Sequence, residues 1–326
     1  DSYGDTDDSK LLGQGSGIEI LPNRWCLPPN LYSVLAPYLH RRTLARATVF
    51  KTNQPNGAWC AVVAKCLFLK RLVVRCGFLW SDFMVRLTTS RWRRMLAECL
   101  EGAIFRAGDA LIVAGHADRT KIIQRYDIDA GRIHVVPNYV DTSLFRLMPE
   151  VPRESRLVIT VGRLEEQKNT ASLIEAVKEL PGVKLRIVGD GSLRADLEER
   201  VRKYNLDVEF LGAIPHKELP RLLNEAELFI LPSHYEGNPK ALFEAMACGL
   251  PVIGTRVPGI QEALIHEETG FLCGTTPSDI RAALHEMFER SELRERVSCR
   301  ALAYAQERFS LTRIAQRELA VLTTLS

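Results

Sequence analysis

The sequence lacks the long apolar runs, metal-ligand spacings and low-complexity stretches that would place it in several large classes of protein. No run of 18 apolar residues occurs, so we expect no membrane-spanning helix. The eight cysteines include no C-x-x-C pair, which supports neither a zinc site nor a disulfide framework. We therefore interpret the cysteines as buried free thiols of a protein from a reducing compartment.

The charge is unevenly distributed along the 326 residues, whose net charge is only +3. Residues 41–94 contain twelve lysines or arginines and one acid, Asp82. Aromatic residues are interleaved with these charges, among them Trp59, Trp80 and Trp92. Basic and aromatic side chains together suit an anionic membrane surface or a nucleic acid, and a solvated basic face is the other interpretation. Because no nucleic-acid-binding motif accompanies the charge, we expect no nucleic-acid partner.

The order of apolar segments predicts an α/β protein with two domains. In the second half, short β-branched runs alternate with amphipathic stretches, which is typical of a parallel, doubly wound sheet. The expected strands are 47–50, 72–76, 110–114, 133–136, 157–161, 184–188, 208–211, 228–231 and 251–254. The polar stretch 146–153 is the best linker candidate. Because ligands of such sheets bind at the carboxyl ends of the strands, the turns after these strands are where chemistry is expected.

The turn after the strand at 157–161 carries two cations. Gly162 frees the backbone, and Arg163 and Lys168 flank the start of the next helix. Two cations at a helix N-terminus can bind a multiply charged anion such as a diphosphate. Two solvated surface cations are the alternative.

A second turn contains Gly189, Asp190 and Gly191 between a strand and a helix. This Gly-x-Gly pattern could hold a nucleotide, but Arg194 stands where the dinucleotide-binding fingerprint needs a third glycine. A plain turn is an equally good interpretation.

The third turn begins at the end of the strand at 228–231. Asn238 is a good N-cap and Pro239 a good first helical residue, so a helix is predicted at about 239–248. Glu236 precedes this helix and Glu244 lies inside it. Carboxylates at such a helix start can accept hydrogen bonds from sugar or ribose hydroxyls, whereas the alternative is a capped core helix with two solvated acids.

Taken in order and at this spacing, these motifs resemble the donor-binding domain of family-4 glycosyltransferases, which are retaining enzymes of the GT-B fold. Glu236 and Glu244 reproduce that family's two glutamates separated by seven residues. The resemblance extends over about residues 98–323. Its segments are 137–145, 161–169, 187–191, 210–212 and 232–253.

The resemblance implies roles for individual residues. Arg163 and Lys168 would neutralise the donor diphosphate, Glu244 would bind the ribose, and Glu236 would contact the transferred sugar. It thus implies catalytic roles for Glu236, Arg163 and Lys168, and donor-binding roles for Gly162, Gly189, Asp190, Gly191, Gly212, Gly237, Asn238, Lys240, Ala241 and Glu244. It implies neither a metal ion nor another cofactor.

The resemblance also implies an α/β GT-B fold, two Rossmann-like domains whose parallel sheets face a cleft. We expect an acceptor-side domain at 1–148, a donor-binding domain at 153–310, and a last helix, 311–326, that packs back on the first domain. The family opens with a strand and a Gly-rich loop. Because the glycine-rich stretch 13–17 follows no predicted strand, we expect the first domain to be incomplete.

These observations predict a retaining glycosyltransferase that moves a sugar from a nucleotide diphosphate sugar to a glycan or lipid-linked acceptor. Envelope polysaccharide or glycolipid synthesis fits this prediction, with a cytoplasmic location and peripheral contact of 41–94 with an anionic membrane. The main alternative is an inactive or truncated GT-B protein that binds the donor without turnover. GT-B epimerases and phosphorylases lack this ordered set of motifs, and a dinucleotide oxidoreductase lacks its third glycine.

Overall fold

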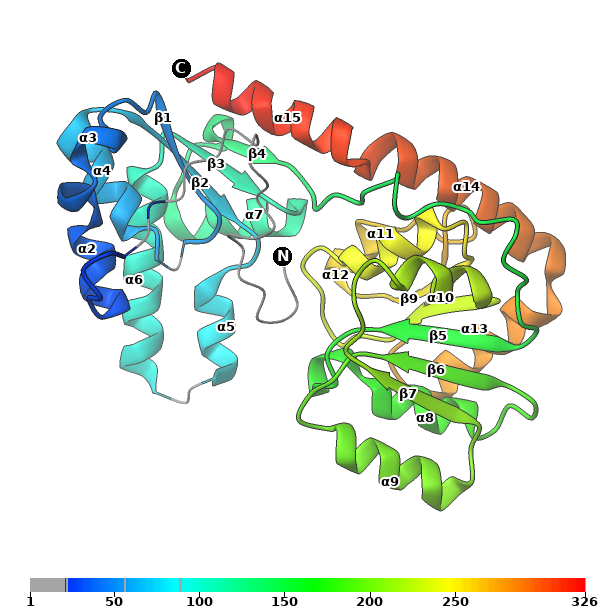
Figure 1. The fold of residues 1–326 in the computed structure, drawn as a ribbon. Helices are drawn as coiled ribbons and strands as arrows, with labels where there is room; N and C mark the ends of the chain where they lie inside the picture. Colours follow the sequence, from blue (N-terminus) through cyan, green and yellow to red (C-terminus); the bar gives the residue numbers. More distant parts are fainter. Residues whose placement is uncertain (1–20, 22, 56, 88–89, 326) are drawn as a thin grey trace. The chain divides into compact units, whose positions relative to one another are not determined.

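A computed structural model describes residues 21, 23–55, 57–87 and 90–325. These residues form two compact α/β units (Figure 1). The first unit comprises the described residues up to Ile112 together with 126–134 and 322–325, and the second comprises 113–125 and 135–321. The expected strand at 110–114 therefore ends at the border of the two units. The glycine-rich stretch 13–17 lies outside the described residues.

The first unit is built on a sheet with strand order β1-β2-β3-β4. Strands β1 and β2 run parallel, with Val49 opposite Arg71. The strands are β1 (Val49–Thr52), β2 (Arg71–Cys76), β3 (Ala110–Val113) and β4 (Ile133–Val135). The helices of this unit are α2 (Pro29–Leu39), α3 (Arg41–Leu44), α4 (Trp59–Phe68), α5 (Trp80–Leu87) and α6 (Arg91–Ala107). Helix α7 (His116–Tyr126) follows β3 and, apart from Tyr126, belongs to the second unit.

The core of the first unit follows from two uninterrupted apolar runs. Residues 72–74 of β2 and 111–113 of β3 are fully buried, as expected for central strands of a parallel sheet covered on both faces. A buried carboxylate, Glu101 of α6, caps the first turn of α5. It accepts hydrogen bonds from the Trp80 amide at 2.6 Å, the Ser81 hydroxyl at 2.6 Å and the Tyr126 hydroxyl at 2.5 Å. These donors compensate the burial of a charged group.

The second unit contains a parallel sheet with strand order β10-β9-β8-β5-β6-β7. Its strands are β5 (Leu157–Val161), β6 (Lys184–Val188), β7 (Val208–Gly212), β8 (Leu228–Leu231), β9 (Val252–Thr255) and β10 (Phe271–Cys273). Its helices are α8 (Thr170–Val177), α9 (Arg194–Tyr204), α10 (Leu219–Glu225), α11 (Lys240–Ala247), α12 (Pro258–Gln261), α13 (Pro277–Glu289), α14 (Ser291–Phe309) and α15 (Leu311–Thr323).

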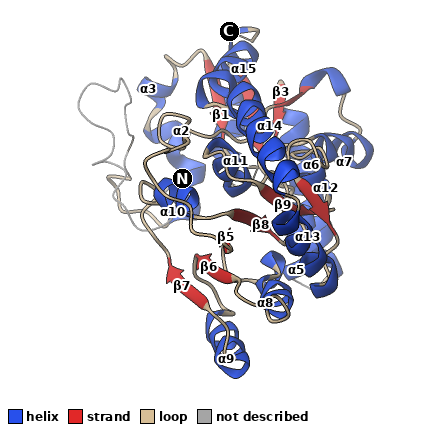
Figure 2. Ribbon diagram, turned by 90° about the vertical axis from the view of Figure 1, so that its right-hand side faces the viewer, coloured by secondary structure: helices blue, strands red, loops and turns tan. Residues whose placement is uncertain are grey.

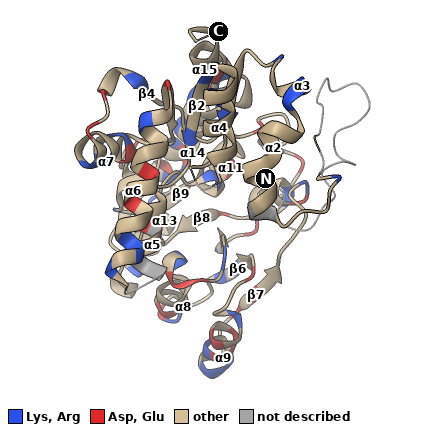
Figure 3. Cartoon of the chain, turned by 90° about the vertical axis from the view of Figure 1, so that its left-hand side faces the viewer, with Lys and Arg blue, Asp and Glu red and all other residues tan. Residues whose placement is uncertain are grey.

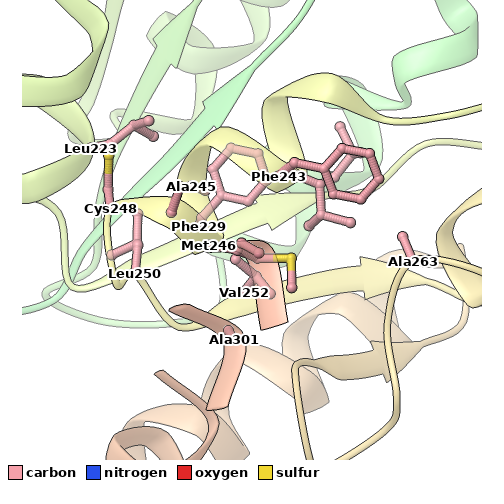
Figure 4. Close-up of a cluster of buried hydrophobic side chains, with 14 of the residues drawn as sticks. Leu223, Phe229, Phe243, Ala245, Met246, Cys248, Leu250, Val252, Ala263 and Ala301 are labelled. Atoms are coloured by element: carbon pink, nitrogen blue, oxygen red, sulfur yellow. The ribbon is translucent and has the colours of Figure 1, made fainter. Parts of the chain in front are cut away.

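Helices cover both faces of this sheet (Figure 2). Successive strand residues point to opposite faces, so Val158 packs with α8, α9 and α13, whereas Ile159 packs with α10, α11 and α12. Figure 4 shows the second cluster, in which Phe243 and Met246 of α11 lie among Phe229 and Val252 of the strands. The fully buried face of α11 fixes this helix on the sheet.

The structure confirms the predicted class of two parallel α/β sheets and places strands at each of the nine predicted segments, with ends shifted by up to two residues. The proposed domain limits and the packing of the last helix stay predictions. The expectation of buried thiols is wrong for four cysteines. Cys76, Cys248 and Cys273 are buried, whereas the exposed ones are Cys26, Cys66, Cys99 and Cys299.

Candidate functional site

The strand order of the second unit determines where a ligand crevice forms. The chain starts the sheet at β5, adds β6 and β7 on one side, and then returns to add β8, β9 and β10 on the other. Neighbouring strands β5 and β8 are thus followed by connections that leave in opposite directions. The carboxyl ends of such a pair are the usual ligand site of an open α/β sheet. The first and third turns singled out from the sequence follow these two strands.

The glycines at these turns permit close backbone approach. The Gly162 amide donates to Val188 O at 2.9 Å, and a Cβ atom on Gly189 would lie 2.0 Å from Gly162 O. Gly189 also has φ +129°, a conformation that favours glycine. A Cβ atom on Gly191 would lie 2.5 Å from Leu164 O. The predicted glycine turns after β5 and β6 therefore pack directly against each other.

Asp190 and Gly212 lie at the same edge of the sheet. The Gly189 amide donates to Gly212 O at 2.8 Å, and Gly212 has φ +66°. The Asp190 carboxylate accepts hydrogen bonds from the Gly191 amide and the Arg194 guanidinium, and these bonds lower the pKa of Asp190. The Gly-x-Gly turn is thus a rigid platform at the ends of β6 and β7.

Lys168 and Glu236 form the centre of the site. Lys168 Nζ lies 2.5 Å from Glu236 Oε1, which also accepts a hydrogen bond from the Ser233 hydroxyl at 2.7 Å. The Glu236 side chain is only 7% exposed and that of Lys168 is 21% exposed. The Thr255 hydroxyl donates to Ser233 O and connects this cluster to β9. A cation and a carboxylate from two different turns therefore meet at the ends of β5 and β8.

Arg163 differs from Lys168 in its contacts. Its residue is exposed, and its guanidinium makes no hydrogen bond or ion pair within the described part of the chain. Asn169, at φ +53°, anchors the same turn, because its amide donates to Pro232 O at 3.0 Å and Thr275 O at 2.9 Å. Among the residues that the structure describes, the turn therefore presents one exposed cation without a hydrogen bond, Arg163, and one paired cation, Lys168.

The predicted N-cap at Asn238 is wrong. Helix α11 begins at Lys240 with Pro239 as its N-cap, and no side chain caps it. The Asn238 side chain instead accepts from the Asn138 amide at 2.7 Å and donates to Ala114 O at 3.2 Å. These partners outcompete the local cap. The first amides of α11, at Lys240 and Ala241, thus have no side-chain partner, which is the arrangement that an anion can use.

Glu244 lies one turn into α11 with a side chain only 5% exposed. Its Oε1 atom is 2.8 Å from His216 Nε2 and 3.8 Å from Lys240 Nζ. Lys240 also lies over the Tyr139 ring, at 5.5 Å from the ring centroid. A buried carboxylate with two cationic or donor groups can accept hydrogen bonds from neutral hydroxyls without a large electrostatic cost.

Gly237 is exposed beside the start of α11. Its carbonyl oxygen lies so close to Gly259 that a side chain at position 259 would clash with it. A Cβ atom on Gly259 would lie 2.3 Å from Gly237 O. The loop before α11 thus packs on the start of α12. The structure brings the candidate residues of the β5–α8 turn and of the β8–α11 turn to one edge of the sheet, with those of the β6–α9 turn beside them.

Sequence reasoning missed three groups of this site. The ring of His216 contacts Glu244, whereas His234 is exposed and its backbone amide donates to Gln167 O. Ser233 and Asn138 support Glu236 and Asn238. The available signals were the position of Ser233 directly after the strand end and that of Asn138 in a family motif. No local pattern points to His216.

The residues described contain no cluster of three or more histidines, cysteines or acids that could hold a metal ion. They also contain no helix long and apolar enough to cross a membrane.

Two family models match the chain. One, described as "Glycosyl transferases group 1", matches residues 146–303, and the other, described as "Glycosyltransferase Family 4", matches residues 6–144. The chain belongs to the family-4, group 1 glycosyltransferases. The first match contains Arg163, Lys168, Glu236 and Glu244, so the motif resemblance is confirmed at the level of the family.

Curated relatives match over about half of this chain. Glycogen synthase of Mycobacterium tuberculosis is 31% identical over 188 residues, which are 56% of this chain and 45% of that protein. The amylovoran biosynthesis glycosyltransferase AmsK of Erwinia amylovora is 33% identical over 168 residues, which are 48% of this chain and 41% of that protein. The chain thus spans about half the length of the curated relatives that it matches.

Solved structures match over both units. HepE of Anabaena, in a complex with UDP and glucose, has a TM-score of 0.81 at 23% identity, covering 99% of this chain and 90% of that chain. Sucrose-phosphate synthase of Thermosynechococcus elongatus has a TM-score of 0.76 at 24% identity, covering 92% of this chain and 80% of that chain. The glycosyltransferase therefore has the GT-B fold, as predicted.

Proposed function

We propose that this glycosyltransferase transfers a sugar from a nucleoside diphosphate sugar to an acceptor with retention of anomeric configuration. The observation that carries the proposal is the meeting of Lys168, Glu236 and the uncapped start of α11 at the ends of β5 and β8. Support for the donor class comes from the HepE structures, one of which contains UDP-glucose.

The proposed chemistry uses the charge that develops on the leaving group. A diphosphate gains negative charge as the sugar–phosphate bond breaks, and fixed positive groups stabilise that charge most when they are already in place. Arg163, Lys168 and the first amides of α11 are such groups. The proposal needs no metal ion, because these cations and the helix N-terminus supply the positive potential.

Glu236 and Glu244 take different roles in the proposal. Glu236 is held by Lys168 and Ser233 beside the diphosphate position and contacts the transferred sugar. Glu244, deeper on α11, accepts hydrogen bonds from the ribose hydroxyls. The acceptor then attacks the face of the sugar that the diphosphate leaves, which preserves the configuration.

We further propose that the acceptor is a glycan or lipid-linked sugar presented at an anionic membrane, with the first unit as the peripheral contact. Figure 3 shows a basic segment on α3 and both basic and acidic segments on α6. Trp92 and Met95, at the start of α6, are 62% and 63% exposed and lie beside Arg93 and Arg94. Exposed apolar side chains among cations suit the interface of an anionic bilayer. The name of AmsK, a glycosyltransferase of amylovoran biosynthesis, is compatible with such an acceptor.

Proton NMR of donor breakdown tests the reaction without knowledge of the acceptor. The chain is incubated separately with UDP-glucose, GDP-mannose and ADP-glucose, so that water replaces the acceptor. All three donors carry α-linked sugars, and retention therefore predicts that the α-anomer of the free sugar appears first. Glu236→Gln should slow this release, whereas Glu199→Gln on the exposed face of α9 should not. Release of the β-anomer first would contradict retention.

Donor binding without any release in this assay would favour the alternative of a binding protein without turnover. Membrane contact is tested by co-sedimentation with vesicles. Binding to phosphatidylglycerol vesicles, lost in an Arg93→Glu/Arg94→Glu variant and absent with phosphatidylcholine, is the expected result. Equal binding to both lipids would contradict the electrostatic contact.

A further inference from the structure

His216 connects a loop of the sheet to the buried acid of α11. It lies between β7 and α10, and its Nε2 atom is 2.8 Å from Glu244 Oε1. Its side chain is 45% exposed, whereas that of Glu244 is 5% exposed. A carboxylate can only accept a hydrogen bond, so Nε2 carries the proton and His216 is the donor.

Other groups fix the His216 ring in this position. The ring of Phe145 lies against it, with a centroid distance of 4.9 Å, and Phe145 is buried. Phe145 is positioned by a turn in which the Asp141 carboxylate accepts hydrogen bonds from the amide and hydroxyl of Ser143. These bonds, chiefly that from the hydroxyl, lower the pKa of Asp141, and a charge on His216 acts in the same direction.

The hydrogen bond leaves the two oxygens of Glu244 unequal. Oε1 receives the bond from His216 and lies near Lys240. Within the described part of the chain, Oε2 receives no hydrogen bond. Because a carboxylate is planar, holding one oxygen fixes the direction in which the other presents its lone pairs. An oxygen so fixed is suited to accept hydrogen bonds from a pair of neighbouring hydroxyls.

We propose that His216 is a positioning residue for the donor. It holds Glu244 so that the second carboxylate oxygen accepts hydrogen bonds from the ribose hydroxyls, and it thereby sets the preference of the site for ribonucleotides. This inference rests on the proposed function. His216 itself acts through Glu244, and the diphosphate and the transferred sugar are bound by other residues.

The proposal predicts that removing the N–H group of His216 weakens recognition of the ribose ring of the nucleotide specifically. His216→Ala should weaken binding of the ribonucleoside diphosphate by about 10- to 150-fold, the range for a hydrogen bond to a charged acceptor. The His216→Ala variant should bind the 2′,3′-dideoxy nucleotide almost as tightly as the unchanged chain does. His216→Gln, which keeps an N–H group at a similar reach, should restore much of the preference.

Calorimetric titrations with UDP, GDP and ADP, each beside its 2′,3′-dideoxy counterpart, test the proposal. The readout is the ratio of the two dissociation constants, in which effects on diphosphate binding cancel. The ratio should fall in His216→Ala, recover in His216→Gln and stay unchanged in Lys217→Ala, an exposed neighbour. Circular dichroism checks that each variant is folded.

Two results would overturn the inference in distinguishable ways. If the chain binds a diphosphate and prefers ribose, but His216→Ala keeps that preference, His216 has no positioning role while the proposed function stands. If the folded chain binds none of the six nucleotides, the proposed function fails and the inference fails with it.

Discussion

The ion pair between Lys168 and Glu236 should contribute to stability and at the same time oppose diphosphate binding. Lys168→Met removes the cation and keeps an apolar stem of similar length. Glu236→Gln removes the anion and keeps the acceptor oxygen for Ser233. The double variant removes both charges. Together with the unchanged chain, these proteins form a double-mutant cycle.

The magnitude follows from the distance and the burial. Two unit charges 2.5 Å apart attract by about 7 kcal/mol at an effective dielectric constant of about 20, before the cost of desolvation. Exposed ion pairs contribute about 0–1 kcal/mol to the free energy of unfolding, whereas removing one partner of a buried pair lowers it by about 3–5 kcal/mol. The pair lies between these limits, because Lys168 is 21% and Glu236 7% exposed. We therefore expect a coupling energy of about 2 kcal/mol.

All four tryptophans lie in the first unit, so their fluorescence follows the unfolding of that unit alone. Urea unfolding followed by far-ultraviolet circular dichroism reports both units, and tryptophan fluorescence reports the first unit. Each single variant should lower the circular dichroism midpoint, and the double variant should lose less than the two singles together. Lys203→Met on exposed α9 serves as the matched control.

The two single variants should change the affinity for a diphosphate in opposite directions. Lys168→Met should weaken it by at least about 10-fold, the effect of losing one favourable charge contact. Glu236→Gln should strengthen it by about 3- to 10-fold, since a repelling carboxylate is removed and Lys168 is released. Additive stability effects, or weaker diphosphate binding by Glu236→Gln, would refute this view of the pair.

Three further predictions concern the scaffold of the site. Gly189→Ala should abolish donor binding and lower the thermal midpoint, because its Cβ atom would lie 2.0 Å from Gly162 O; an unchanged midpoint in a melting curve would contradict this. Asn169→Gly keeps the backbone conformation but removes two hydrogen bonds, so urea unfolding should show a loss of about 1–3 kcal/mol, and Asn169→Ala should lose more; equal losses would argue against backbone strain. Burial raises the pKa of Cys248 and of Cys273 to about 12, so the thiolates are scarce at pH 8 and both should resist iodoacetamide in the folded chain until the pH approaches 12. Peptide mass mapping should find label first on the exposed cysteines, and early label on the two buried ones would contradict this ordering.

Local patterns predicted β5 to β9 of the second unit, because each of these segments is rich in apolar residues and adjoins or contains a glycine or proline, whereas the short strand β10 was not predicted. The glycines after β5 and β6 were also predicted, since they stand at strand ends where backbone segments meet. The cysteines show the limit of such reasoning. Cys66, Cys99 and Cys299 lie on helices, where one position of an apolar stretch can face solvent.

Contacts between distant residues could not be predicted from one sequence. Asn238 is a residue type that favours the N-cap position, yet its side chain bonds to Asn138, one hundred residues earlier in the chain. His216 and Glu244 lie on different elements and meet only because β7 and α11 reach the same edge of the sheet. The predicted domain limits involve the same kind of long-range information, since α7 shares residues with both units.

Calorimetric titration of the chain with UDP, GDP and ADP tests most directly whether the ends of β5 and β8 form a donor site. Arg163→Ala and Glu244→Gln probe the two ends of that site, and Glu199→Gln on α9 is the charge-matched control. The proposed site requires that one diphosphate binds and that both site variants weaken it by at least about 10-fold, with the control unchanged. A folded chain that binds none of the three, or site variants that bind as tightly as the unchanged chain, would contradict it.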